Sequence, residues 1–548
     1  MNAADKKTDN QKTIPQISFD ICGRLLNLFV YPFFISVIII GIAVVSNVVR
    51  AQNTPAKGSA QAFEPVDRQG ALDKKALAKS LAHYTLGLIY DNEAKITEAT
   101  KEYSKALEYN NKHPNIYLRL GVDYMILCKY KSAIKMLNLA KKLTAPEDTR
   151  PRFLLALVYT EVKKLESAQK EYEEIIRVNP QSLQALSSLA DLYVLGKRLE
   201  DAASIYERLL KKNKGLSVTP ADIRNEAMLH FNLGLIYAKM GKLDDAILQL
   251  EEVLVLQPKN TDVYLALAVL YGLNKKPDEA IKKYKELLEK APLNVNARRL
   301  LGYLYLSQKM LQEGLHQFEA VSRLEPDNPQ GYVDLAVTYS KLNRVDDAKA
   351  VIGRAKKKGI KNLGLFLVEG IIYSSNNEFI EALDAYKKAL RLDPKNSMSN
   401  FYLGTVYEEM GKRDQAVYFL NKAIRFDEKN AEAYNYLGYT YADDGVNLDE
   451  AIALINKAIE LDPKNGAFID SLGWAFYKKG LIDEAIKELE RAARIDPRDP
   501  TIREHLGDAY FKKGLRARAV KEWVWALKAN PKQKGVKEKI KRSYKGKK

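Results

Sequence analysis

The sequence predicts an all-α solenoid of about thirteen helix-turn-helix repeats, preceded by a single N-terminal membrane-spanning or signal helix. Three observations predict this fold. A small residue recurs at a nearly constant spacing, the same apolar skeleton surrounds each copy, and glycine or proline stands between the apolar segments. Self-similarity at a period of about 34 residues is typical of stacked helical repeats.

The small residue marks the register of the array. It follows Leu in all but one copy, where Glu369 replaces it, and successive copies are 34 or 35 residues apart except for one step of 44. The copies are Gly87, Gly121, Ala156, Ala190, Gly234, Ala268, Gly302, Ala336, Gly370, Gly404, Gly438, Gly473 and Gly507. The longer step predicts an insertion at residues 211–226. A lengthened helix with a surface loop is the favoured interpretation, and a segment that contacts a partner is the alternative.

Each repeat contains two amphipathic segments. Leu403, Gly404 and Tyr407 share one helical face, because residues three and four apart are neighbours on a helix. Ala382 and Tyr386 represent the second segment, where Ala and an aromatic residue stand four apart. Twelve repeats carry a Tyr three positions after the small residue, and we expect these tyrosines to lie in the core. Such a hairpin cannot bury its apolar face alone, so neighbouring hairpins must stack.

The last full unit shows the skeleton completely, with Leu506-Gly507, Tyr510, Ala519, Trp523, Ala526 and Pro531. This pattern resembles the tetratricopeptide repeat (TPR) family over about residues 80–533, in thirteen copies. The resemblance implies a right-handed superhelix in which the first helix of each repeat lines the concave surface. It also implies binding of proteins or peptides rather than catalysis.

The N-terminal part divides into a polar segment at 1–24, an uncharged stretch at 25–49, and a linker with a leading helix at 50–79. Twenty-five uncharged residues are long enough to span a hydrocarbon core of about 30 Å as a helix. An uncleaved anchor with an exported TPR array is therefore the favoured interpretation. A secreted protein, cleaved near Ala51, is the alternative.

The net charge of +18 is concentrated at the C-terminus. Residues 532–548 hold nine Lys or Arg against the single acid Glu538. The segment 534–548 is interpreted as a basic tail or capping helix, with contact to anionic lipid or nucleic acid as the other reading. No nucleic-acid partner is expected, since no interleaved basic and aromatic motif accompanies the charge.

The sequence offers no constellation for catalysis, so we expect no enzyme, no cofactor and no metal. The five histidines fall in separate repeats, and no motif for metal or phosphate binding occurs. The two cysteines, Cys22 and Cys128, make no disulfide framework, and we expect Cys128 to be packed in the second repeat.

Aromatic and polar residues off the repeat skeleton predict a partner-binding groove in the C-terminal repeats. The TPR resemblance carries these residues to the concave surface, just before and after the small residue. They are Phe401, Asn435, Tyr439, Asp470, Trp474, Tyr477, Glu504, Asp508 and Phe511. Aromatic anchors with a few polar groups suit a peptide or a partner helix. The Lys, Asn and Arg set of the two-carboxylate clamp, by which some TPR proteins hold chaperone tails, is lacking.

The C-terminal repeats also resemble bacterial envelope TPR adaptor proteins, on the runs Tyr436-Leu437-Gly438-Tyr439 and Leu472-Gly473-Trp474. The prediction is therefore a non-enzymatic scaffold, single-pass in a bacterial inner membrane with a periplasmic array. Two alternatives stay open: a cytoplasm-facing assembly factor for a membrane complex, and a subunit that presents substrates to a separate protease or glycosyltransferase.

Overall fold

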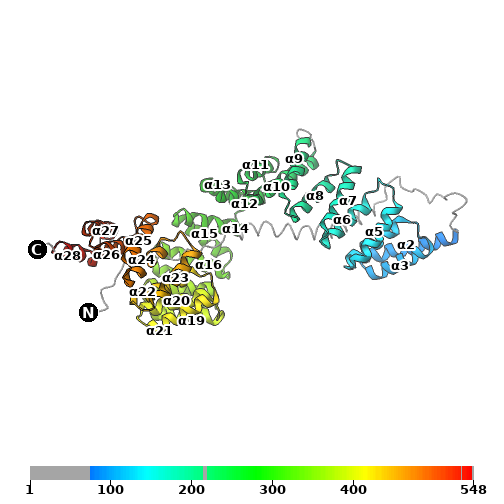
Figure 1. Cartoon of the computed structure of the whole chain (residues 1–548). Coiled ribbons are helices and arrows are strands. Elements are labelled where there is room, and N and C mark those ends of the chain that lie inside the picture. Colours follow the sequence, from blue (N-terminus) through cyan, green and yellow to red (C-terminus); the bar gives the residue numbers. More distant parts are fainter. Residues whose placement is uncertain (1–73, 214–218, 532, 546–548) are drawn as a thin grey trace. The chain divides into compact units, whose positions relative to one another are not determined.

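The computed structural model describes residues 74–213, 219–531 and 533–545, which form 27 α-helices, α2 to α28, and no strand (Figure 1). The first helices of the hairpins are α2 (Lys74–Asn92), α4 (Pro114–Ile126), α6 (Arg150–Glu161), α8 (Leu183–Leu195), α10 (Pro220–Lys239), α12 (Thr261–Leu273), α14 (Val295–Ser307), α16 (Pro329–Lys341), α18 (Leu363–Ser375), α20 (Ser397–Glu409), α22 (Ala431–Asp444), α24 (Gly466–Lys479) and α26 (Pro500–Lys512). The second helices are α3 (Ile96–Tyr109), α5 (Tyr130–Leu143), α7 (Leu165–Val178), α9 (Leu199–Asn213), α11 (Leu243–Leu256), α13 (Pro277–Lys290), α15 (Leu311–Leu324), α17 (Val345–Lys357), α19 (Phe379–Leu392), α21 (Arg413–Phe426), α23 (Leu448–Leu461), α25 (Ile482–Ile495) and α27 (Arg516–Ala529), and α28 (Lys534–Lys545) follows. Thirteen hairpins and one extra helix thus account for the described chain, which confirms the predicted solenoid of helical repeats.

The chain divides into two compact units. Described residues up to Ala297 form the N-terminal unit, and those from Arg298 onward form the C-terminal unit. Within each unit, successive helices pack against one another in chain order. Within a unit, a hairpin therefore buries its apolar face on its sequence neighbours, as expected for a repeat array.

The small residue of each first helix makes room for a large side chain of the second helix. Gly370 faces the ring of Tyr386, and Gly507 faces the indole of Trp523, sixteen positions later in both cases. A Cβ atom at Gly370 would lie 2.3 Å from Tyr386 Cε1, closer than any real contact. The two helices of the hairpin can therefore approach closely, and both large side chains are fully buried.

A left-handed residue joins the two helices of every hairpin, always seven positions after the small residue. These residues, with φ between +56° and +88°, are Ala94, Cys128, Lys163, Lys197, Gly241, Lys275, Lys309, Asn343, Asn377, Gly411, Gly445, Gly480 and Gly514. The next residue donates its N–H back to a carbonyl five positions earlier, as Lys412 does to Tyr407 at 2.8 Å. This is the hydrogen bond of a Schellman turn, which satisfies a carbonyl at the end of a helix.

The turn corrects the expectation for Cys128, which is exposed rather than packed. Its position in the repeat is that of the left-handed turn residue, at φ +56°. A side chain at this point projects from the end of a hairpin and has no core to enter.

The tyrosines three positions after the small residue lie at the edge of the core, and the expectation that all twelve are core residues was too broad. Three of them, Tyr305, Tyr339 and Tyr510, are buried, and the other nine are half-buried. The hydroxyls of Tyr237, Tyr271, Tyr339 and Tyr510 each donate to a glutamate, that of Tyr510 to Glu490 Oε1 at 2.6 Å. A phenol can bury its ring only as far as its hydroxyl can still find a partner.

The insertion lengthens α10, which has 20 residues where most first helices have 13 or 14. Its start is fixed by a capping box in which the Thr219 hydroxyl accepts the Asp222 N–H, and the Asp222 carboxylate accepts the Thr219 N–H. Glu369, which replaces the usual Leu, is buried and forms an ion pair with Lys356.

The end of the array is covered by α28, which packs on α27. Val536 of α28 is buried in the last hydrophobic cluster, together with Trp523 and Leu506. This helix occupies the segment for which the sequence predicts a basic tail or capping helix. The predicted span at 25–49 lies outside the described residues, and none of the described helices combines the length and apolar character that crossing a membrane requires.

Candidate binding surfaces

The structure brings several of the predicted groove residues together on α22, α24 and α26. The indole of Trp474 stacks on Tyr477 at 4.9 Å and on His505 at 4.2 Å between ring centroids. Trp474 Nε1 also donates to Asp443 Oδ1 at 3.4 Å. Trp474 is thus the centre of an aromatic stack that joins two adjacent repeats.

His505, which sequence reasoning left aside, is the buried partner of Asp470. Its Nδ1 lies 2.9 Å from Asp470 Oδ2, and both residues are less than 10% exposed. Burial lowers the pKa of His505, but Asp470, together with Asp508 and Glu504, outweighs it, so the pKa is raised above its usual value. The sequence does contain a signal for this contact: Asp470 and Trp474 are four positions apart, on one face of a helix, and His505 follows in the next repeat, 35 positions after Asp470.

The carboxylates of Glu504 and Asp508 are engaged by α28. Lys539 Nζ lies 2.6 Å from Glu504 Oε1 and 2.6 Å from Asp508 Oδ2. Asp508 Oδ1 also accepts a hydrogen bond from Trp523 Nε1 at 3.0 Å. Burial alone would lower the pKa of Lys539. The Asp508 and Glu504 carboxylates together have the larger, opposite effect, so the pKa lies above its usual value. The capping helix therefore occupies the acidic end of the predicted groove.

The other predicted groove residues differ in exposure. Phe401 is 7% exposed and packs edge-on against Tyr436 at 5.9 Å, so it belongs to the core and not to the concave surface. Asn435 and Tyr439 are half-buried, and Asn435 Oδ1 has no hydrogen-bond partner among the described residues. Burial raises the pKa of Tyr439 above its usual range, and the Asp443 and Asp470 carboxylates add to it. Phe511 is 40% exposed.

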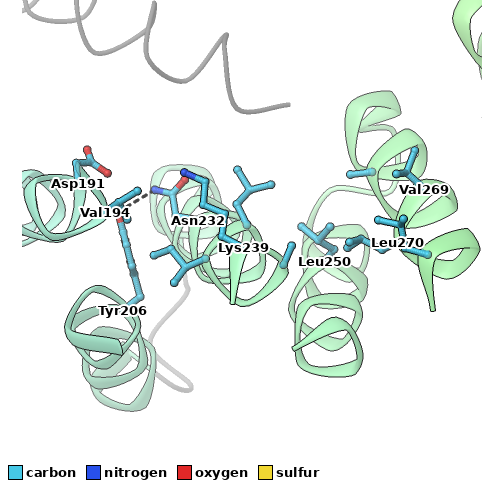
Figure 2. A pocket seen from close by; sticks show the side chains of 13 residues that line it. Asp191, Val194, Tyr206, Asn232, Lys239, Leu250, Val269 and Leu270 are labelled. Atoms are coloured by element: carbon cyan, nitrogen blue, oxygen red, sulfur yellow. Dashed lines mark hydrogen bonds between the residues drawn. The ribbon is translucent and has the colours of Figure 1, made fainter. Parts of the chain in front are cut away.

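A pocket lies in the N-terminal unit, where the sequence analysis named no binding residue. Side chains of α8 to α12 line it: Asp191, Val194, Tyr206, Asn232, Leu235, Ile236, Ala238, Lys239, Leu250, Ala266, Val269, Leu270 and Leu273 (Figure 2). We call it the α8–α12 pocket. Its cavity volume of about 60 Å³ exceeds the room that one water molecule needs.

The pocket follows the register of the concave surface. Asp191, Leu235 and Val269 each stand one position after the small residue of their repeats, as Tyr439 and Trp474 do in the C-terminal unit. The residues Ala238 and Ala266 are small, which leaves space between their larger neighbours. The position one residue after the small residue could have identified this site from the sequence. It was missed because the prediction favoured aromatic over aliphatic residues at that position.

Polar groups stand at one side of this apolar pocket. Asn232 Nδ2 donates to the Tyr206 hydroxyl at 3.1 Å, and Figure 2 shows Asp191 on the same side, with Lys239 on α10. Burial raises the pKa of Asp191 to about 6, although the Lys239 ammonium opposes this shift. Burial also lowers the pKa of Lys239, with Asp191 opposing. The pocket can therefore offer apolar contact together with an incompletely compensated carboxylate.

The described residues contain no group of three or more His, Cys, Asp or Glu side chains that could hold a metal ion. The residues gathered at the two surfaces are suited to binding through stacking, apolar burial and ion pairing.

Comparisons with known proteins identify the repeat. Family profiles described as "TPR repeat" match residues 370–411, 406–445 and 473–514. Profiles described as "Tetratricopeptide repeat" match residues 153–216, 231–295, 265–329, 81–113 and 431–465. Together these matches cover more than half of the chain.

Among curated proteins, Superkiller protein 3 of Schizosaccharomyces pombe is 29% identical over 126 residues, which are 23% of this chain. The match spans only 9% of that protein's length. Among solved structures, the APC/C hetero-tetramer Cut9-Hcn1 is similar with a TM-score of 0.41 and 16% identity, covering 86% of this chain and 97% of that chain. The MamA protein is similar with a TM-score of 0.27 and 30% identity, covering 31% of this chain and 93% of that chain.

Proposed function

Because the chain belongs to the tetratricopeptide repeat family, we propose that it is a non-enzymatic scaffold that binds segments of protein partners along its concave surface. The observation that carries this proposal is the α8–α12 pocket, which combines aliphatic walls with a carboxylate in the concave register. Concave sites with mostly apolar walls and a few polar groups are the usual places for a ligand to bind.

The chemistry of the pocket indicates the kind of segment it takes. Leu235, Leu250 and Val269 can bury an aliphatic or aromatic side chain of the partner. The Asp191 carboxylate, whose pKa of about 6 reflects its burial, gains from an approaching cation. We therefore propose an apolar anchor next to a Lys or Arg as the partner sequence for this site.

The experiment is to fill the pocket. Ala238→Phe places a ring in the cavity, and we expect it to abolish recovery of partners that co-purify after crosslinking. Leu248→Phe, which adds a ring at a side chain of α11 that is 58% exposed, is the matched control and should leave recovery unchanged. Equal recovery by both variants, with unchanged helical circular dichroism, would contradict the proposal.

The aromatic stack of the C-terminal unit is proposed as a second, separate contact at the equivalent repeat positions. Its support is the half-buried stack of Trp474 on Tyr477, close to Tyr439 in register. Changing Trp474 and Tyr439 to Ala together should remove a partner from a pull-down while the helical circular dichroism stays intact. Unchanged partner recovery would exclude this part of the surface.

The location of the scaffold is proposed from the sequence alone. The uncharged stretch 25–49 is proposed to anchor the chain in a membrane, with the array on the exported side of a bacterial envelope. A topology reporter fused after Lys548 should be active on the exported side. Reporter activity confined to the cytoplasm would favour the cytoplasm-facing assembly factor, and a mature N-terminus near Ala51 would replace the anchor by a cleaved signal.

A further inference from the structure

The exposed face of α27 carries two apolar side chains between two lysines. Val524 is 39% exposed and Trp525 is 48% exposed. Lys521 and Lys528 stand one turn before and one turn after them, and both are exposed. Since residues three and four apart are neighbours on a helix, these four side chains form one continuous strip, which we call the outer strip.

The other twelve repeats show that this strip departs from the pattern of the chain. Val524 and Trp525 stand 17 and 18 positions after the small residue Gly507. The corresponding pairs are Ser104-Lys105, Asn138-Leu139, Glu173-Glu174, Glu207-Arg208, Glu251-Glu252, Lys285-Glu286, Glu319-Ala320, Gly353-Arg354, Lys387-Lys388, Asn421-Lys422, Asn456-Lys457 and Glu490-Arg491, with a shift of one in the repeat of Gly438. Each of these pairs has at least one charged or polar side chain, and none has two apolar residues. The fold therefore does not require an apolar pair at this register.

The surroundings of the outer strip are strongly basic. The exposed cations between residues 516 and 544 are Arg516, Arg518, Lys521, Lys528, Lys537, Lys541 and Arg542. The one exposed acid in this stretch is Glu538, whereas Glu522 is buried and forms an ion pair with Arg503 at 2.7 Å. The Lys528 ammonium also lies 5.4 Å from the centroid of the Trp525 ring.

The helix α28, which packs on α27, carries further exposed cations. It packs on α27 through Val536, and its exposed residues Lys537, Lys541 and Tyr544 follow one another at spacings of four and three. Tyr544 is 63% exposed. The capping helix thus buries one face in the array and presents cations and a phenol on another.

We propose that α27 and α28 form a docking surface for an anionic lipid bilayer. Trp and Tyr favour the boundary between headgroups and hydrocarbon, and Lys stems lie along apolar surface while their ammonium groups reach the phosphates. Cations near an anionic membrane add attraction that salt screens. One exposed Trp can enter a fluid bilayer without a surface of matching shape.

An acidic protein or a single-stranded nucleic acid fits the outer strip less well. A protein interface needs a well-packed apolar centre larger than two side chains. A nucleic-acid groove places successive aromatic platforms beside its cations. The outer strip lies on a second helix, outside the concave register, so this proposal stands independently of the proposed partner binding.

The test uses the full chain with a local reporter, because the stretch 25–49 can itself enter vesicles. Cys22→Ser and Cys128→Ser remove the native thiols, and Ala517→Cys places an environment-sensitive dye on the exposed face of α27, four positions before Lys521. The matched control is Asp449→Cys on α23, which stands at the same register two repeats earlier and is 88% exposed.

Vesicles of phosphatidylcholine with about 30% phosphatidylserine should brighten the dye at position 517 but not the dye at 449, because only a dye beside the docking surface reaches the bilayer. Trp525→Ala should weaken this response. Lys521→Gln with Lys528→Gln should raise the lipid concentration at half-response about 25-fold, or about fivefold for each lysine. Salt at ~0.5 M should suppress the response.

Three results would overturn the proposal. The dye at 517 could respond equally to pure phosphatidylcholine, the dye at 449 could respond as strongly as that at 517, or no response could occur on anionic vesicles. A stronger response at 517 to polyglutamate or to single-stranded DNA than to anionic vesicles would assign the surface to an acidic macromolecule instead.

Discussion

At the scale of single residues, the contact between the small residue and the side chain sixteen positions later determines how closely the helices of a hairpin approach. Gly370 and Tyr386 show this at its tightest, and Tyr386 also stacks on Tyr402 of the next repeat at 5.3 Å. The ring cannot move away from Gly370 without disturbing that second contact. Tight packing on both sides makes this glycine sensitive to substitution.

Gly370→Ala should therefore lower the free energy of unfolding of the C-terminal unit by about 1–2 kcal/mol, because the added methyl group overpacks the site. Gly353→Ala on α17 is the matched control, since nothing lies within 4 Å of a Cβ there. The control should raise stability by up to ~1 kcal/mol through helix propensity. Urea denaturation of both variants measures the difference, and equal effects would contradict the packing argument.

The ion pair of His505 with Asp470 gives the C-terminal unit a pH dependence. Its raised pKa means that the folded state binds a proton more tightly than the unfolded state. This stabilisation is fully present below the unfolded value of about 6.5 and is lost as the pH rises through the folded pKa.

His505→Gln should therefore destabilise the protein more at pH 5.5 than at pH 8.5, as measured by urea denaturation at the two pH values. Asp470→Asn should reduce the same pH dependence, because it removes the carboxylate that stabilises the protonated imidazole of His505. A loss of stability that is equal at both pH values would show that the contact acts through packing alone.

At the scale of elements, the hairpin turn has one backbone conformation throughout the array but several residue types. Gly occupies the left-handed position in five repeats, and Lys309 adopts φ +61° at the same register. A left-handed conformation costs a residue with a Cβ atom roughly 1–2 kcal/mol. The Schellman hydrogen bond from Met310 N–H to Tyr305 C=O, at 2.9 Å, holds it in place.

Lys309→Gly should raise the free energy of unfolding by up to about 1 kcal/mol, since the strain it removes exceeds the added freedom of the unfolded chain. Gly480→Lys should lower it by a similar amount, because Gly480 has φ +86° at the same register. Thermal denaturation of the two variants measures both effects. A shift of the same sign in both would contradict the argument.

The elements themselves were largely predictable, because the repeat specifies them many times over. The spacing predicted about thirteen hairpins with glycine or proline between the apolar segments, and the structure confirms the hairpins and places turns at glycines such as Gly411 and Gly480. The burial of Phe401 and the exposure of Cys128 were not predicted. The first depends on the aromatic neighbours that adjacent repeats supply, and the second on a turn conformation that non-Gly residues rarely adopt.

At the scale of the whole molecule, the ends of the array matter because each repeat is stabilised only by its neighbours. The capping helix α28 covers the last hairpin through Val536 and through the ion pairs of Lys539. A terminal repeat without a cap exposes its apolar face to water. The sequence predicted a basic tail or capping helix at 534–548, but not the ion pairs of Lys539, which depend on how the helix packs on α26 and α27.

Ending the chain after Gln533 should destabilise the C-terminal repeats first. Hydrogen exchange should become faster in α26 and α27 and stay unchanged in the N-terminal unit, because stability in repeat arrays is a nearest-neighbour property. Lys539→Met, which keeps the helix and removes its charge, should produce a smaller change. Uniformly faster exchange in both units would contradict this description.

The turn register also has a consequence for how backbone strain is distributed along the chain. Among the nine hairpins from Gly87 to Gly370, the left-handed position is glycine only once, at Gly241, whereas it is glycine in all four that follow. The earlier turns are therefore more strained, because most of their left-handed residues carry a Cβ atom, whereas the later turns have glycine there. We therefore expect the two parts of the array to differ in melting temperature, although they are built on the same hairpin. Substitutions to glycine at the turns should stabilise the earlier part more than any turn substitution can stabilise the later part.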